Sequence, residues 1–160
     1  MYTSGSTGKP KGVVLTHRNL LSTLSAIIIM VLSYKIDSDM YLSYLPTSHI
    51  LEYIIQLAAL TGGVPIGFGT PHSLTDAMVR GCRGDLAELR PTLLAGVPQV
   101  WDTIRREIMY QVRRRGRRVE KVFGAFVSLK WYLMQNSLPH SWLDWLVFNK
   151  VKRVLGGRLR

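Results

Sequence analysis

A polar loop near the start of the chain combines residue types that can bind an anion with several oxygen atoms. The run Tyr2–Val13, YTSGSTGKPKGV, holds hydroxyl side chains, glycines and two lysines. Glycine lets backbone N–H groups approach a ligand closely, and the hydroxyls and lysines add donors and positive charge. A phosphate chain fits such donors most naturally, so the sequence predicts a phosphate-binding loop.

The spacing of this loop differs from that of the Walker phosphate loop, which has four residues between its glycines. Gly5 and Gly8 are only three positions apart, and Pro10 follows Lys9 where a Walker loop has Ser or Thr. Because proline disfavours a helical residue before it, the loop should not lead directly into a helix. β-prone residues flank it, so we expect strand, turn and strand. A mobile surface hairpin is the alternative, because a short glycine-rich loop is a weak signal.

The complete run Thr3–Gly12, T-S-G-S-T-G-x-P-K-G, resembles the phosphate loop of the adenylate-forming (AMP-binding) enzymes. That family includes acyl-CoA synthetases, luciferases and the adenylation domains of peptide synthetases. In its pattern Lys9 falls on the variable position, and Lys11 is the motif lysine. The resemblance implies that Lys11 and Thr7 act in catalysis. The residues that it implies for binding ATP phosphates are Thr3, Ser4, Gly5, Ser6, Thr7, Gly8 and Lys11.

Three further segments resemble the long-chain acyl-CoA synthetases of eukaryotic type. They are Tyr44–Tyr53 (Y-x-P-x-x-H-x-x-E, then Tyr), Gly84–Ile104 (G-D, then P-T and V-P-x-V-W-D), and Asp144–Arg160, which is similar to the stretch before the family's adenine-binding region. The resemblance implies that His49 lines the nucleotide and acyl sites. It also implies that Tyr53 and Gly96 border a fatty-acid tunnel, although Tyr53 fits the core equally well.

The resemblance implies a two-step reaction that uses ATP, Mg²⁺ and coenzyme A. A fatty-acid carboxylate attacks the α-phosphate of ATP, pyrophosphate leaves, and the acyl-adenylate then passes its acyl group to the coenzyme A thiol. The family's adenine-contacting Y-G-x-T-E, its ribose-binding T-G-D and its lysine-bearing lid are not found in the sequence. We therefore expect a fragment of the N-terminal domain, without useful catalysis of its own.

Composition limits the class of protein. With 160 residues and 47% hydrophobic content, the chain can form one domain with a core. The net charge of +11 predicts attraction to polyanions, which are nucleotides, acidic membrane surfaces or nucleic acid. A single cysteine, Cys82, excludes an internal disulfide and favours an intracellular, reducing compartment. We expect the parent at the endoplasmic reticulum, mitochondrial outer membrane or peroxisome in peripheral contact, or otherwise in the cytoplasm.

The apolar patterns predict an α/β layered fold with a largely parallel, incomplete sheet and a helical C-terminal third. Within one partial AMP-binding domain over 1–160 we expect a phosphate loop (1–13), an α/β acyl-site region (40–100) and a helical segment (101–155). The expected strands are 40–45, 64–68 and 92–97. The expected helices are 20–32 (capped by Asn19), 50–60 (ended by Gly62–Gly63), short helices capped by Ser73 and Asp85, 99–115 (with Pro98 at its start), 117–134 (after an interruption at Gly116) and 142–155 (capped by Ser141). The apolar stretch 20–34 is too short to span a membrane and is expected to be a buried helix.

A basic run over 105–121 leaves other partners open. A solvated helix face is the usual interpretation of such a run, and contact with acidic membranes or with coenzyme A phosphates is the alternative. Nucleic acid is not expected, because no nucleic-acid motif is present and the aromatics lie among leucines, as core residues do. These aromatics are Trp131, Tyr132, Trp142 and Trp145. Metal ligands are not expected either, since His49 and Glu52 alone make no site.

Two other hypotheses remain beside the long-chain ligase. The first is another adenylate-forming ligase, acting on aryl or amino acids. The second is a basic module without enzymatic activity that binds nucleic acid or membranes, for which a steep salt dependence would be the signature. The segments at Gly84–Ile104 and Asp144–Arg160 favour the long-chain ligase over the other adenylate-forming ligase, and the basic module stays open.

Overall fold

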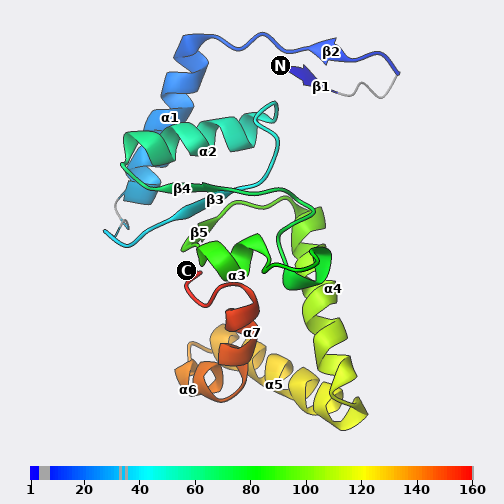
Figure 1. Ribbon diagram of the computed structural model, residues 1–160. Coiled ribbons are helices and arrows are strands. Elements are labelled where there is room, and N and C mark those ends of the chain that lie inside the picture. The colour runs from blue at the N-terminus through cyan, green and yellow to red at the C-terminus, as the bar shows by residue number, and fades with distance from the viewer. Residues whose placement is uncertain (4–7, 33, 35, 160) are drawn as a thin grey trace. The chain divides into compact units, whose positions relative to one another are not determined.

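Figure 1 shows the computed structural model of the chain, which describes residues 1–3, 8–32, 34 and 36–159. The chain divides into two compact units. Unit 1 comprises Met1–Pro71 and Pro91–Ala95, and unit 2 comprises His72–Arg90 and Gly96–Leu159. The predicted division at 1–13, 40–100 and 101–155 stays a prediction.

Unit 1 is built on a parallel three-stranded sheet. Its strands are β3 (Tyr41–Ser43), β4 (Ile66–Phe68) and β5 (Leu93–Leu94), in the order β4-β3-β5. Both neighbours pair with β3 in parallel, and Tyr41 lies opposite both Ile66 and Leu93. Leu42 on the central strand is fully buried, as expected where both faces of a parallel sheet are covered. The α/β prediction with a parallel sheet is therefore confirmed, with strands shorter than predicted.

Helix α2 (Ile50–Thr61) connects β3 to β4 and completes a β-α-β unit. It ends at the predicted Gly62–Gly63 pair. There Gly63 has a φ of +64°, and the Val64 N–H donates to the Ala59 carbonyl at 2.8 Å. This left-handed turn, which glycine adopts at little cost, sends the chain into β4.

Helix α1 (His17–Leu32) packs against α2 (Figure 1) but is less buried than predicted. Ile29 and Met30 are 72% and 69% exposed, so the expectation of a buried helix is wrong for this face of α1. The face that contacts α2 is only half-buried. Among the described residues, no helix is both long and apolar enough to cross a membrane.

The cap of α1 also differs from the prediction. Asn19 lies inside the first turn, and Thr16 precedes the helix. The Thr16 hydroxyl donates to Asn19 Oδ1 at 2.6 Å, and its oxygen accepts from the Asn19 N–H at 3.2 Å. The Thr16 N–H also donates to Asn19 Oδ1 at 3.1 Å. This reciprocal arrangement is that of a capping box, with Asn in place of Glu or Gln.

Unit 2 is helical. Its elements are a 3₁₀ turn η1 (Asp76–Met78), α3 (Asp85–Leu89), α4 (Pro98–Arg114), α5 (Arg117–Gln135), α6 (Ser141–Leu143), a π-helical turn η2 (Asp144–Phe148) and α7 (Asn149–Val154). Pro98 begins α4 and Gly116, with a φ of +108°, separates α4 from α5, as predicted. The predicted last helix is present as three consecutive pieces.

The predicted side-chain caps in unit 2 are wrong. The N-cap positions of η1, α3 and α6 belong to Thr75, Gly84 and His140, none with a side-chain cap hydrogen bond. Instead, the Ser73 hydroxyl donates to Asp85 Oδ2 at 2.5 Å and ties the loop before η1 to α3. A hydrogen bond between residues twelve positions apart therefore takes the place of the two predicted cap hydrogen bonds of Ser73 and Asp85.

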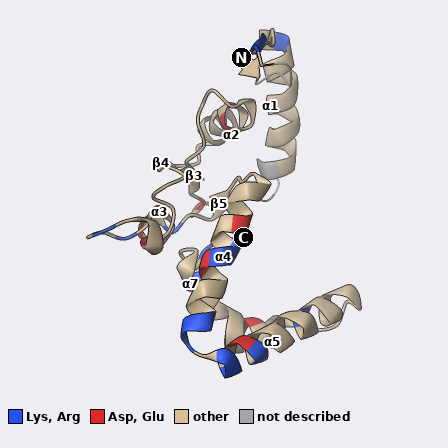
Figure 2. Cartoon of the chain, turned by 90° about the vertical axis from the view of Figure 1, so that its right-hand side faces the viewer, with Lys and Arg blue, Asp and Glu red and all other residues tan. Residues whose placement is uncertain are grey.

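The aromatic residues expected in the core of the C-terminal third lie at its surface. Trp131, Tyr132, Trp142 and Trp145 are between 50% and 77% exposed, so that expectation is wrong. Lys and Arg residues gather where α4 meets α5 (Figure 2), which agrees with a solvated basic face.

Candidate functional site

A β-hairpin frames the predicted phosphate loop. Strands β1 (Tyr2–Thr3) and β2 (Lys11–Gly12) are antiparallel, with Thr3 opposite Lys11. The Val13 N–H donates to the Met1 carbonyl at 2.7 Å, and the amino group of Met1 donates to the Val13 carbonyl at 3.0 Å. The prediction of strand, turn and strand is confirmed by this pairing. The loop residues Ser4, Gly5, Ser6 and Thr7 lie outside the described residues.

The described part of the hairpin presents a hydroxyl and an ammonium group on paired residues at the base of the turn. Thr3, Gly8 and Lys11 are all exposed, and the Thr3 hydroxyl donates to the Lys11 carbonyl at 3.4 Å. Gly8 has a φ of +87°, and a Cβ placed there would meet nothing within 4 Å. Glycine is thus required at this position by backbone conformation and not by crowding. The phosphate-binding roles of these residues stay predictions.

His49 is the N-cap residue of α2 and follows the carboxyl end of β3. Its Nδ1 accepts a hydrogen bond from the Leu51 N–H at 3.3 Å, so the proton of a neutral ring lies on Nε2. The side chain is exposed. Ligands of open parallel sheets bind at the carboxyl ends of the strands, where His49 lies. The ring therefore has a capping role in the structure, and its role toward nucleotide or acyl group stays a prediction.

A buried hydrogen-bond network joins the first turn of α2 to β3. Glu52 is fully buried, and the Tyr41 hydroxyl lies 3.0 Å from its Oε1 and 2.9 Å from its Oε2 as donor. Gln56 Nε2 lies 2.7 Å from Ser43 Oγ and 3.4 Å from Glu52 Oε1. Sequence reasoning considered Glu52 as a motif residue and as a metal ligand that makes no site with His49 alone, and missed this network. The signals available were the i, i+4 pair of Glu52 and Gln56 and the tyrosine on the preceding strand.

Two buried phenols beside Glu52, those of Tyr41 and Tyr44, have raised pKa values. Burial, followed by the negative charge of Glu52, raises the pKa of Tyr41 far above its ordinary value. The same two causes raise the pKa of Tyr44 to about 12. The Tyr44 hydroxyl is buried and has no hydrogen-bond partner among the described residues. The Tyr41 hydroxyl therefore has a hydrogen-bond partner, whereas the Tyr44 hydroxyl, three residues later, has none among the described residues.

Unit 1 also contains an apolar pocket of about 930 Å³, including the part open to solvent. Its walls come from α1, α2, β3 and the β5 region, and they comprise Ile27, Ile28, Tyr41, Leu51, Ile55, Ala58, Ala59, Val64, Leu93, Leu94 and Ala95. His49 and the half-buried Tyr53 are not part of this lining. The tunnel role predicted for Tyr53 stays a prediction.

Gly96, the other residue predicted for the tunnel, belongs to unit 2 and packs against an indole ring. The Trp101 Nε1–H donates to the Gly96 carbonyl at 3.1 Å. A Cβ on Gly96 would lie 2.7 Å from that nitrogen. The ring thus gives a packing reason for glycine here, and the tunnel role of Gly96 stays a prediction.

Comparison with known proteins relates this chain to enzymes that use nucleotides. The model of a family described as AMP-binding enzyme matches residues 1–154. The chain belongs to the AMP-binding enzyme family. No solved structure matches it.

The chain is similar to curated ligases along its whole length. It is 50% identical to long-chain-fatty-acid–CoA ligase 2 of Schizosaccharomyces pombe, covering 100% of the chain and 23% of the relative. It is 38% identical to long-chain-fatty-acid–CoA ligase 1 of Saccharomyces cerevisiae, with 100% and 23% covered. Identity to the peroxisomal long chain acyl-CoA synthetase 7 of Arabidopsis thaliana is 40%, with 99% and 22% covered. The chain spans about a quarter of the length of these relatives.

Several motif residues of the chain hold the fold together. Gly84 of the G-D pair lets the chain pass so close to Thr75 that a Cβ would lie 2.4 Å from the Thr75 carbonyl carbon. The Gly84 N–H donates to Asp76 Oδ1 at 2.7 Å. Thr92 of the P-T pair donates its hydroxyl to Asp39 Oδ1 at 2.7 Å, and both side chains are buried. Part of the motif similarity therefore reflects packing and not ligand binding.

Metal binding by the chain's own side chains finds no support in the described residues. They contain no group of three or more His, Cys, Asp or Glu side chains that could hold a metal ion.

Proposed function

We propose that the chain forms part of a long-chain fatty-acid–CoA ligase, which activates a fatty acid with ATP and transfers the acyl group to coenzyme A. The observation that carries the proposal is the whole-chain similarity, up to 50% identity, to enzymes named as such ligases. Membership of the AMP-binding family agrees with a reaction that forms an acyl-adenylate. An aryl- or amino-acid ligase has no such support.

The hairpin is proposed to hold the β- and γ-phosphates of ATP. Exposed Thr3 and Lys11 lie on paired residues at its base, and Gly8 turns the chain without a side chain in the way. Together with 4–7 they would supply backbone donors, hydroxyls and one positive charge. Charge develops on pyrophosphate as it leaves, and preorganised donors stabilise that charge most in the transition state. Lys11 and Thr7 are therefore the proposed catalytic residues.

His49 is proposed to contact the nucleotide or the acyl carboxyl group. Its Nδ1 is engaged by the Leu51 N–H, which leaves Nε2–H as a donor on an exposed ring. The adjacent pocket of unit 1, which includes Leu51 of the same helical turn, has the apolar lining that an acyl chain requires. Tyr53 and Gly96 are the proposed tunnel residues.

Mg²⁺ is proposed to reach the site with ATP, because the described residues offer no cluster of ligands for it. The ion would neutralise phosphate charge, while the hairpin residues position the phosphates. Coenzyme A is the proposed acyl acceptor.

We also propose an intracellular location with peripheral contact to acidic membranes. The net charge of +11 attracts such surfaces, and the gathered Lys and Arg residues at the α4–α5 turn strengthen that attraction locally. One similar protein is named as peroxisomal.

A chimeric enzyme tests the proposed function directly. The matching quarter of the Schizosaccharomyces pombe ligase is replaced by this chain, and fatty-acid-dependent exchange of labelled pyrophosphate into ATP is measured. We expect exchange with long acids in particular. Lys11→Ala should reduce the exchange rate roughly 10²- to 10³-fold, the loss typical for one oxyanion donor, and should weaken fatty-acid binding far less. Lys9→Ala, at the variable position of the motif, is the matched control and should change little.

Two results would contradict the proposed ligase, and a third would contradict only the catalytic role of Lys11. A folded chimera without exchange on any acid would overturn the ligase function. Exchange restricted to aryl or amino acids would assign the chain to another adenylate-forming ligase. Equal losses in Lys11→Ala and Lys9→Ala would remove Lys11 from catalysis while leaving the ligase function standing.

A further inference from the structure

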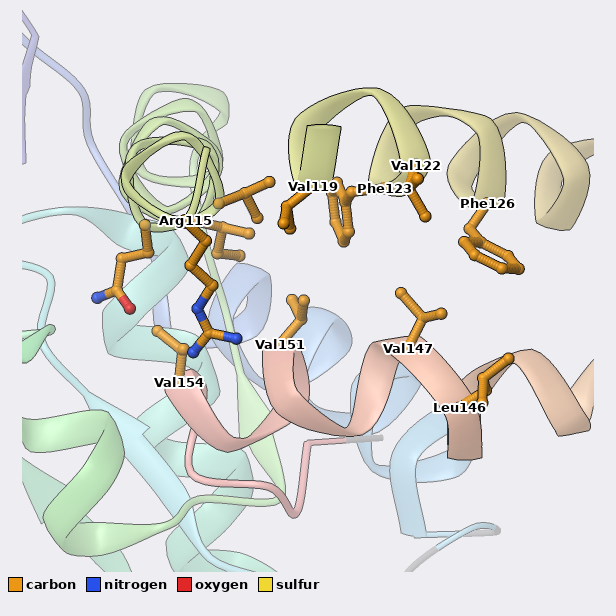
Figure 3. A pocket seen from close by; sticks show the side chains of 12 residues that line it. Arg115, Val119, Val122, Phe123, Phe126, Leu146, Val147, Val151 and Val154 are labelled. Carbon is orange, nitrogen blue, oxygen red and sulfur yellow. The ribbon is translucent and has the colours of Figure 1, made fainter. Parts of the chain in front are cut away.

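Unit 2 contains an open groove that none of the predicted site residues lines. It runs between α5 on one side and η2 with α7 on the other, and the end of α4 closes one end (Figure 3). Its volume is about 770 Å³, including the part open to solvent. The lining consists of Ile108, Gln111, Val112, Arg115, Val119, Val122, Phe123, Phe126, Leu146, Val147, Val151 and Val154.

The sequence produces this groove by placing two apolar faces opposite each other. On α5 the residues Val119, Val122, Phe123 and Phe126 recur at the i, i+3, i+4 and i+7 positions of one helical face. Figure 3 shows these side chains pointing toward those of Val147 and Val151 across the groove. All of them are apolar, so water gains few hydrogen bonds there and an apolar occupant would be favoured.

The two walls meet at only part of their length. Phe123 and Phe148 form an edge-to-face pair with their ring centroids 5.9 Å apart. The Lys130 ammonium group forms an ion pair with Asp144 and lies 4.7 Å from the centre of the Phe148 ring. These contacts join α5 to η2, and the groove lies beside them. An elongated apolar occupant could therefore enter without separating the helices.

One cation lies at an end of this otherwise apolar groove. The Arg115 side chain extends from the end of α4 toward Val154 (Figure 3). The two arginines that precede it in the basic run contact other groups. Arg113 Nε forms an ion pair with Glu120 Oε1 at 2.8 Å, and the Arg114 guanidinium lies 6.0 Å from the centre of the Tyr110 ring. The groove thus combines an apolar channel with a guanidinium group at one end.

We propose that this groove binds a free fatty acid, with its chain along the valine and phenylalanine walls and its carboxylate on the Arg115 guanidinium. A planar guanidinium matches a carboxylate in geometry as well as in charge, and the pair forms two parallel hydrogen bonds. Among the lining residues only Gln111 and Arg115 have polar side chains, and both come from the end of α4, where a fatty acid would place its single charged group. The site goes beyond the proposed reaction and relies on it only for the choice of a fatty acid.

Titration of the whole chain with laurate below its micelle concentration tests the proposal, with dodecanol as the uncharged probe of equal length. Arg115→Gln should weaken laurate binding about tenfold and leave dodecanol binding unchanged, because it removes only the charge-assisted hydrogen bonds. Arg118→Gln removes the same charge from an exposed residue outside the groove and should alter neither affinity. Calorimetry gives the affinities, and circular dichroism verifies the fold of each variant.

A second variant tests the apolar walls. Val151→Phe should fill the groove and abolish binding of laurate and dodecanol alike. If that variant unfolds, Val122→Asn at the exposed rim should weaken both probes by replacing an apolar contact with a polar group. Failure of laurate to bind, unchanged affinity in both wall variants, or equal effects of Arg115→Gln and Arg118→Gln would each overturn the site. Binding to anionic vesicles without monomer binding would overturn it in favour of a membrane-contact surface.

The groove and the proposed reaction can fail separately. A chimera that exchanges pyrophosphate, together with a chain that does not bind laurate, would overturn the groove alone. Laurate binding that depends on Arg115, together with a folded but inactive chimera, would sustain the groove and overturn the ligase function.

Discussion

Units 1 and 2 attach their helices by different kinds of contact. In unit 1 the fully buried Glu52 accepts from Tyr41 on β3, and Gln56 donates to Ser43 on the same strand. In unit 2 the attachment of α7 depends on close backbone approach. A Cβ on Gly156, just after α7, would lie 2.3 Å from the Leu86 carbonyl oxygen of α3. Side-chain hydrogen bonds hold α2 on β3, whereas the absence of a side chain at Gly156 lets the end of α7 approach α3.

This difference determines which substitutions each unit tolerates. Removing one member of a buried hydrogen-bond network leaves the others desolvated and unsatisfied, so unit 1 should be sensitive to deleted groups. Where backbones already touch, an added methyl group has no space, so the α3–α7 contact should be sensitive to added groups. The contrast bears on both proposals, since the network of unit 1 includes the first turn of α2, which His49 caps, and α7 forms part of the groove of unit 2.

The largest expected effect is at Gly156. Gly156→Ala should destabilise the protein by at least about 3 kcal/mol. The backbone strain of an alanine at a φ of +82° adds to the steric clash of its Cβ with the Leu86 carbonyl oxygen. Gly157→Ala is the matched control, since Gly157 has a φ of +77° but nothing within 4 Å of an added Cβ. It should lose only about 1 kcal/mol, from backbone strain. Urea unfolding followed by tryptophan fluorescence measures both, and equal losses would disprove the steric explanation.

The next largest effect on stability is expected at Tyr41 and Tyr44 of unit 1. Tyr41→Phe removes the donor to the buried Glu52 and should cost about 1–3 kcal/mol. Tyr44→Phe removes a buried hydroxyl without a described partner, so stability should change by less than about 0.5 kcal/mol or rise slightly. Urea unfolding followed by far-ultraviolet circular dichroism compares them. A Tyr44→Phe variant as unstable as Tyr41→Phe would show that the network extends further than described.

Alkaline pH should weaken unit 1 before unit 2. The folded-state pKa of Tyr44 is raised to about 12 by burial and by Glu52, and that of Tyr41 is raised further. A raised pKa contributes stability that is complete below the unfolded value of about 10 and is lost as pH rises through the folded value. All four tryptophans, residues 101, 131, 142 and 145, belong to unit 2. Between about pH 10 and 12, circular dichroism should therefore change before tryptophan fluorescence. Simultaneous changes would contradict a separate unit 1.

Sequence reasoning predicted the elements well where the signal is local. Pro98, Gly116 and the Gly62–Gly63 pair mark helix boundaries. The proline ring fixes φ at Pro98, and Gly63 and Gly116 adopt a positive φ, so each signal depends on the residue's own backbone. The hairpin around the proposed phosphate loop is also predictable, because β-prone residues and glycine specify strand and turn within a dozen residues. Of the candidate site, this pairing is confirmed, whereas the roles of Lys11 and His49 stay predictions.

What the sequence could not predict depends on partners distant in the chain. Ser73 carries the composition of a helix cap, yet Asp85, twelve residues away, takes its hydrogen bond. The exposure of Trp131 and Trp145 follows from which faces α5 and η2 turn toward each other, and hydrophobic composition does not specify that choice. The groove containing Arg115 has the same origin, since it exists only once α4, α5 and α7 have packed.

The smallest expected effect concerns the ion pair between α5 and η2. The hydrogen bond from Lys130 is the main cause that holds the pKa of Asp144 below its usual value, against the opposing effect of burial, and the charges of Lys130 and Lys152 add to it. A lowered pKa contributes stability that is present above the unfolded value and is lost as pH falls through the folded value. Because both side chains are about a quarter exposed, Asp144→Asn should cost no more than about 1 kcal/mol.

Acid titration of tryptophan fluorescence checks this last expectation. The wild-type signal should lose stability below about pH 4, and Asp144→Asn should remove part of that dependence. Asp102→Asn, at an exposed carboxylate of α4, is the matched control and should leave it intact. A loss of several kcal/mol in Asp144→Asn would show that unit 2, like unit 1, is sensitive to a deleted polar group. The contrast between the two units would then apply to the α3–α7 contact alone.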